Sequence, residues 1–162
     1  MVMEEINQLA FEVGSILREH RLKLVVVESC TGGLLSGSIT AIVGSSAYFD
    51  SGLIVYSNQA KQELLGVKKS TLEKFGAISE EVALEMARGA KLVGDGLVVS
   101  ITGIAGPDGG SLAKPVGTVC FAVLLNNQES TTTQHFSGDR EAVRWQSVKF
   151  ALKAMRGALA TL

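Results

Sequence analysis

This chain has little cysteine, little proline and no excess of charge of either sign. It contains only Cys30 and Cys120, which excludes a framework of several disulfides. Its 15 basic and 16 acidic residues give a formal net charge of -1, whereas nucleic-acid-binding domains usually carry a basic excess. Two prolines accompany 18 glycines, so glycine provides most of the turn signals.

Long apolar runs are missing as well. None approaches the roughly 20 residues that a membrane-spanning helix needs, and the first ten residues include Glu4, Glu5, Asn7 and Gln8 in place of a signal-peptide core. We therefore predict a cytoplasmic protein with two free thiols. The 162 residues, of which 46% are hydrophobic and 19% charged, predict a single globular domain over residues 1–162.

Helical and strand-like patterns alternate along the chain. Apolar spacing predicts helices at about 4–20, 34–43 and 58–65. Capping residues predict three more helices, which start at Ser70 (with Glu73 in capping-box spacing), at 79 and at 139. Apolar runs predict strands at 24–27, 53–56 and 97–101, then an antiparallel pair at 116–125 and 130–136 joined through Asn126 and Asn127. This alternation predicts an α/β fold, a three-layer α/β/α sandwich around a mixed, partly parallel sheet.

Three of the predicted strands end in polar or glycine-rich turns. These turns are residues 28–33, 56–61 and 102–110. In an open parallel sheet, ligands bind beyond the carboxyl ends of the strands. If the three strands are parallel, the three turns line one pocket.

Ser29 lies where a strand gives way to a helix. Unpaired backbone amides at such a turn suit a phosphate or a developing oxyanion, and Gly32 and Gly33 remove side chains that would block close approach. A serine before a helix is also an ordinary cap, and a glycine pair is an ordinary turn. On this motif alone, both interpretations stay open.

Lys61 lies on the short helix after the second strand. Most lysines are solvated surface charges, and a catalytic base needs a pKa near about 7 to 8 instead of the ordinary value of about 10.4. Burial against apolar walls, or another cation nearby, would lower the pKa in this way. The two histidines, His20 and His135, are predicted to be surface or packing residues and offer no better base.

Two further features suit a phosphorylated ligand. The loop 103–110 has four glycines and one proline, and it fits either a phosphate cradle or an ordinary tight loop, but not a Walker loop. Within it, Asp108 either binds a ribose hydroxyl or shapes the turn. Arg140 and Arg144 lie one helical turn apart near the start of the last helix, where an arginine can hold a phosphate bidentately.

Six stretches resemble, in order, those of the CinA C-terminal domain family: 28–33, 56–61, 76–80, 100–110, 114–118 and 136–140. The resemblance covers the chain almost end to end. It implies hydrolysis of nicotinamide mononucleotide to nicotinate mononucleotide and ammonia, in the recycling of pyridine nucleotides. Larger family members add a pyrophosphatase-like domain, and this chain is too short to hold it, so that activity is expected to be absent.

The resemblance also implies roles for individual residues. It makes Ser29 the nucleophile, Lys61 its base and Tyr56 a residue that assists proton transfer, and it places Thr102 in the pocket. The residues expected to contact the substrate are Cys30, Thr31, Gly32, Gly33, Thr102, Gly103, Gly106, Asp108, Arg140 and Arg144. We expect no cofactor, and no metal because the sequence offers no convincing cluster of ligands.

Other interpretations remain. Cys30 is an alternative nucleophile, because a thiolate forms more readily than an alkoxide. The same loops would also serve a regulatory module that binds a pyridine nucleotide without turnover. A nucleic-acid accessory role for the basic last helix is opposed by the nearly neutral charge, so we expect neither nucleic acid nor membrane as a partner. A homo-oligomer, such as a dimer, is expected because dimers are common.

Overall fold

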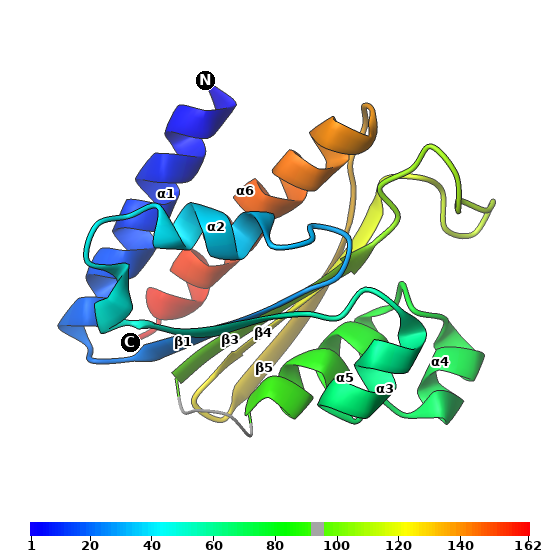
Figure 1. Cartoon of the computed structure of the whole chain (residues 1–162), viewed down its shortest axis with the longest axis horizontal. Coiled ribbons are helices and arrows are strands. Elements are labelled where there is room, and N and C mark those ends of the chain that lie inside the picture. Colours follow the sequence, from blue (N-terminus) through cyan, green and yellow to red (C-terminus); the bar gives the residue numbers. More distant parts are fainter. Residues whose placement is uncertain (92–95) are drawn as a thin grey trace.

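Within residues 1–91 and 96–162, which the computed structural model describes, a mixed sheet of five strands forms the centre of the fold (Figure 1). The order of the strands is β2-β1-β3-β4-β5. Strands β2, β1 and β3 are parallel, and β4 runs antiparallel to both β3 and β5. The strands are β1 (Lys23–Glu28), β2 (Phe49–Ile54), β3 (Gly96–Gly103), β4 (Thr118–Leu125) and β5 (Gln128–His135).

Helices cover both faces of this sheet. One face carries α1 (Val2–Glu19), α2 (Leu34–Thr40) and α6 (Arg140–Leu159), and the other carries α3 (Asn58–Leu65), α4 (Lys69–Phe75) and α5 (Glu80–Lys91) (Figure 1). A short 3-10 helix, η1 (Ser45–Ala47), precedes β2. The predicted three-layer sandwich is confirmed. None of the helices in the two described ranges is long and apolar enough to cross a membrane.

The inner strands are buried on both faces, which explains why their sequences are mostly apolar. Along β1, Leu24 and Val26 belong to the core shared with α1 and α6, whereas Val25 and Val27 belong to the core shared with α5. All of β4 is buried in the same way. The packing of these two cores fixes the positions of the ends of the parallel strands relative to one another.

Several predicted element boundaries are wrong, among them those of β2, α4 and α2. Strand β2 begins at Phe49 and not at 53, because an edge strand needs no apolar run, and its residues alternate between half-buried and exposed. Helix α4 has Lys68 as its N-cap, so the capping box of Ser70 and Glu73 does not form. Helix α2 ends at Thr40, before the predicted 43.

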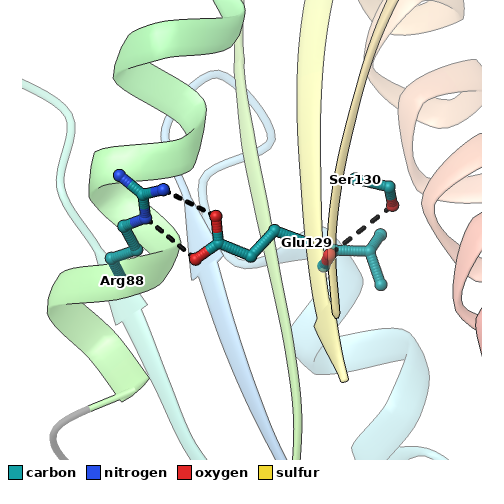
Figure 2. Close-up of polar contacts among 4 residues, drawn as sticks. Arg88, Glu129 and Ser130 are labelled. Carbon is teal, nitrogen blue, oxygen red and sulfur yellow. Dashed lines mark hydrogen bonds and ion pairs between the residues drawn. The ribbon is translucent and has the colours of Figure 1, made fainter. Parts of the chain in front are cut away.

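An ion pair joins helix α5 to the edge strand β5 (Figure 2). Nε and Nη2 of Arg88 donate to the two carboxylate oxygens of Glu129 at 2.9 and 2.6 Å. On the same strand, the hydroxyl of Ser130 donates to the carbonyl of Val123 in β4. Because the Arg88 side chain is about half exposed, such a pair contributes at most about 1 kcal/mol. Helix α5 is held mainly by its apolar stripe, which is fully buried: Val82, Ala83, Met86, Ala87 and Ala90.

Candidate active site

The carboxyl ends of the three parallel strands border one pocket of about 300 Å³. Each of the three polar turns contributes to its wall, so the prediction that they meet is confirmed. Nine predicted site residues line it: Ser29, Cys30, Tyr56, Lys61, Thr102, Gly103, Gly106, Asp108 and Arg140.

Ser29 and Lys61 are in contact in this pocket. Nζ of Lys61 lies 3.2 Å from Oγ of Ser29 and 3.0 Å from the backbone carbonyl oxygen of Tyr56. The lysine is only 1% exposed. It is placed by the short helix α3, which Ser57 caps at its start and Gly66, at a φ of 68°, ends.

Burial affects the protonation of two groups in the pocket. Removal from water lowers the pKa of Lys61 below its ordinary value of 10.5, which favours the uncharged amine that a base requires. Burial raises the pKa of the Cys30 thiol to about 11, and the nearby charges of Arg144 and Lys61 only partly oppose that rise. A thiol that ionises so late is a poor nucleophile near neutral pH. The thiol therefore loses much of its usual advantage, and the contact with the Lys61 amine makes Ser29 the better candidate for the attacking group.

Several backbone amides in the turn after Ser29 lack a backbone partner among the described residues. The amides of Ser29 and Gly32 donate to backbone carbonyls, whereas those of Cys30, Thr31 and Gly33 have no backbone partner in the described part of the chain. Gly32 and Gly33 adopt φ angles of 56° and 103°, which L side chains disfavour, and this requirement explains both glycines. The expectation that amides of residues 30–33 hold an oxyanion stays a prediction; of Cys30, Thr31 and Gly33, only Cys30 lines the pocket.

Glu28 had no predicted role, yet its carboxylate is fully buried next to Ser29. One oxygen accepts from the amide of Leu35 at 2.9 Å, and the other accepts from the amide and hydroxyl of Ser36 at 3.0 and 2.7 Å. The carboxylate thus pairs amides at the start of α2 that lack a helical partner. It fixes α2 to the end of β1 and, with it, the turn that carries Ser29. An acidic residue that ends a continuously apolar strand was the available signal, because a buried charge needs partners.

Substituting Glu28→Gln is expected to lower the free energy of unfolding by about 1–3 kcal/mol. The amide group places a donor against one of the donors of α2, while the shape of the side chain is kept. Urea denaturation measures the change. The matched control is Glu19→Gln, at an exposed acid at the end of α1, which should stay within about 0.5 kcal/mol of the unmodified chain. Equal stability of the two variants would contradict the structural role of Glu28.

Tyr56 and Arg140 form part of the outer rim of the pocket. Nη2 of Arg140 donates to the Tyr56 hydroxyl at 3.1 Å, and Nη1 donates to the carbonyl of Gly106 at 2.9 Å. Tyr56 is 60% exposed, so its ring lies at the mouth, while its backbone carbonyl contacts Lys61 inside. Its role in proton transfer stays a prediction, because the contact with the amine is made by the carbonyl and not by the hydroxyl.

The remaining wall combines predicted and unpredicted residues. The hydroxyl of Thr102 donates to the carbonyl of Ala77 at 3.0 Å, which ties the end of β3 to the segment before α5. Asp108 lies on the exposed part of the glycine loop. Asn58, Ala77 and Ile78 also line the pocket. The sequence analysis missed all three, since one amide and two apolar side chains carry no chemical signature.

Four predicted site residues do not line the pocket: Thr31, Gly32, Gly33 and Arg144. The first three belong to the turn behind Ser29. Arg144 reaches this turn from helix α6, where its Nε and Nη2 donate to the carbonyls of Cys30 and Thr31 at 3.1 and 3.2 Å.

Comparison with known proteins agrees with the fold. The protein family described as "CinA C-terminal domain" matches residues 6–159 of this chain. The nicotinamide-nucleotide amidohydrolase PncC of Enterobacter agglomerans is 50% identical over 155 residues, covering 94% of each chain. The protein of that name from Escherichia coli K12 is 48% identical over 157 residues, covering 96% of this chain and 95% of that one. A crystal structure of a CinA superfamily protein from Klebsiella pneumoniae matches with a TM-score of 0.93 and 37% identity, over 97% of this chain and 99% of that chain. The chain belongs to the CinA C-terminal domain family.

Proposed function

We propose that this chain hydrolyses the carboxamide of nicotinamide mononucleotide to give nicotinate mononucleotide and ammonia. The observation that carries the proposal is the buried Lys61 amine, 3.2 Å from the Ser29 hydroxyl, in a pocket of about 300 Å³. The names of two relatives that match nearly the whole chain support the same activity. The pyridinium ring of the substrate withdraws electrons from the carboxamide carbon and makes it susceptible to attack by a hydroxyl group.

The first half of the reaction forms an ester on Ser29. As the Ser29 oxygen bonds to the carboxamide carbon, its proton passes to the neutral amine of Lys61. The Tyr56 carbonyl holds one N–H of this amine, so the lone pair can be directed toward the hydroxyl. Free amides of the turn after Ser29 hold the oxyanion. The tetrahedral intermediate then collapses, the carbon–nitrogen bond breaks, and Lys61 gives its proton to the departing ammonia.

The second half of the reaction hydrolyses that ester. A water molecule takes the place of ammonia and loses a proton to Lys61 as its oxygen bonds to the acyl carbon. The bond to the Ser29 oxygen breaks, and Lys61 returns the proton to it. Nicotinate mononucleotide leaves, and both side chains regain their starting states.

Ammonia release from nicotinamide mononucleotide by the purified chain tests the proposal. A coupled assay for ammonia should follow the appearance of nicotinate mononucleotide in a one-to-one ratio. Binding of the nucleotide, measured by calorimetry, without any release of ammonia would support a regulatory binding module and overturn the enzymatic proposal.

The phosphate of the substrate is expected to contribute to recognition through Arg140, which lines the pocket at its rim. Nicotinamide riboside should therefore show a kcat/KM about 10- to 100-fold lower than the mononucleotide, the usual range for a charge-assisted contact. Arg140→Gln should remove most of this difference by lowering the efficiency for the mononucleotide alone. Equal efficiencies for the two substrates with the unmodified chain would eliminate this role of Arg140.

A further inference from the structure

The ammonium form of Lys61 has no acidic partner in the pocket. Its Nζ lies 3.2 Å from Oγ of Ser29 and 3.0 Å from the carbonyl oxygen of Tyr56, and both of these acceptors are uncharged. Among residues 1–91 and 96–162, no carboxylate forms an ion pair with this lysine. Its side chain is 1% exposed, so water does little to compensate its charge. An ammonium group has three N–H donors, and one of them, together with the charge, is therefore available to an anion.

The other charged or titratable groups around Lys61 do not supply this anion. The Cys30 thiol is uncharged near neutral pH because burial raises its pKa to about 11, and Asp108 lies on the exposed part of the glycine loop. Both carboxylate oxygens of Glu28 accept from the start of α2. The remaining groups have other partners: Arg144 the carbonyls of Cys30 and Thr31, Arg140 and Tyr56 each other, and Glu80 and Glu85 of α5 threonine hydroxyls.

The proposed reaction produces a carboxylate beside this amine. When water cleaves the ester on Ser29, the acyl carbon keeps its carbonyl oxygen, gains the oxygen of the water, and leaves the Ser29 oxygen, which regains its proton. The product is at that moment a carboxylic acid, and its carbon has just left an oxygen that lies 3.2 Å from Nζ of Lys61. A carboxyl group has an ordinary pKa of about 4 and a lysine one of about 10.4. The acid therefore gives its proton to Lys61, and a carboxylate faces an ammonium group.

We propose that Lys61, besides acting as the base, binds the carboxylate of the product, so that nicotinate mononucleotide inhibits the chain and inhibits it more strongly as the pH falls. This inference rests on the proposed function and adds regulation of the same site by its product. The carboxylate provides the counter-ion that the buried lysine lacks. Hydrogen bonds between two ionised groups are the stronger ones, particularly away from water. The substrate carries an uncharged carboxamide at the same position and offers no counter-ion.

The direction of the pH dependence follows from the protonation state that each ligand prefers. The carboxylate binds best to the protonated lysine, so binding must take up a proton once the pH exceeds the pKa of the free amine, and the affinity then falls as the pH rises. Burial lowers the pKa of Lys61, which brings the start of this change below 10.5. Attack by Ser29 needs the neutral amine. Low pH therefore weakens turnover and strengthens the hold on the product together.

Calorimetry with the two mononucleotides, which differ only in the reacting group, tests the inference on a Ser29→Ala background that does not consume the amide. Adding Lys61→Met should raise the Kd of nicotinate mononucleotide at least tenfold at pH 7, the range for a charge-assisted contact. The Kd of nicotinamide mononucleotide should change by less than about threefold. Lys68→Met, at an exposed lysine, is the matched control and should change neither value. Thermal unfolding shows whether each variant is folded, and an unchanged Kd of nicotinate mononucleotide in a folded Lys61→Met variant would refute the inference.

Proton uptake provides a second measurement that needs no turnover. Between pH 7 and pH 10, the Kd of nicotinate mononucleotide relative to that of nicotinamide mononucleotide should rise at least threefold, and titrations in buffers of different ionisation enthalpy should show net proton uptake with the carboxylate ligand alone. The phosphate is common to both ligands and cancels in the ratio. Lys61→Met should abolish the rise and the uptake. A chain that releases ammonia but shows a constant ratio would refute the inference alone, whereas one that shows the rise but releases no ammonia from nicotinamide mononucleotide would refute the proposed function.

Discussion

Replacing Ser29 with alanine is expected to lower kcat/KM for ammonia release by about four orders of magnitude or more. The variant loses the oxygen that bonds to the carboxamide carbon, while the amides of the turn and the pocket walls remain. Steady-state measurement of ammonia gives the size of the effect. Binding of nicotinamide mononucleotide, measured by calorimetry, should change by less than about tenfold, because the missing hydroxyl matters mainly in the transition state.

Cys30→Ala is the matched control for this substitution. Its thiol lines the same pocket one residue further along, but burial raises the thiol pKa to about 11. The variant should therefore keep kcat/KM within about threefold of the unmodified chain. If Cys30→Ala lost activity while Ser29→Ala kept it, the nucleophile would be the thiol and the proposed mechanism would be wrong.

The inner strands and the turns that follow them could be predicted from sequence because their signals are local. A strand buried on both faces has a nearly continuous apolar sequence, as at 24–27 and at 97–101, where only Ser100 is polar, and a glycine-rich turn marks where each strand ends. The predicted bounds of helix α3, 58–65, equal the observed ones, because Gly66 is a local signal for the end of the helix. The pocket followed from these elements and from the rule that parallel strands end at the same edge.

Contacts between distant segments could not be predicted from the sequence. Nothing in the residues around Lys61 distinguishes it from a solvated lysine, and its burial arises only when α3 packs against α5 and reaches Ser29. The role of Arg144 could not be predicted from the sequence either. Its place near a helix start predicted an anion ligand, yet the fold directs its donors to the carbonyls of Cys30 and Thr31. The sequence shows which side chains can donate hydrogen bonds, but the tertiary structure determines which acceptors they reach.

Lys61→Met is expected to lower kcat/KM by on the order of 10³-fold, within the range for loss of a general base. Methionine is unbranched and of similar length, so it fills the same space without an amine. Ammonia release measures the loss, and Lys68→Met, at an exposed lysine that caps α4, is the control with expected full activity. A Lys61→Met variant that folds and retains more than about a tenth of the activity would exclude the lysine as the base.

The pH dependence of the same variant tests why the lysine works. Burial lowers the pKa of Lys61 below 10.5, so kcat/KM of the unmodified chain should rise with pH as the amine loses its proton, with a midpoint below 10.5. Residual activity of Lys61→Met should lack this rise. A midpoint at or above 10.5 would mean that the amine is not shifted in the direction that catalysis requires.

The lowered pKa of Lys61 should also make the free energy of unfolding depend on pH, in a direction that follows from the shift. Between the lowered pKa of the folded chain and 10.5 in the unfolded chain, the unfolded state binds more protons, so the contribution of Lys61 to stability improves as pH rises. Below that window the folded chain bears the full cost of burying an ammonium group, and above it the cost disappears. Lys61→Met is free of this cost, so its advantage in unfolding free energy over the unmodified chain should be largest at low pH and shrink toward pH 10.5. Urea denaturation at several pH values measures it, and an advantage that grew with pH would show that the folded protein stabilises the charged lysine, the state that cannot accept a proton from Ser29.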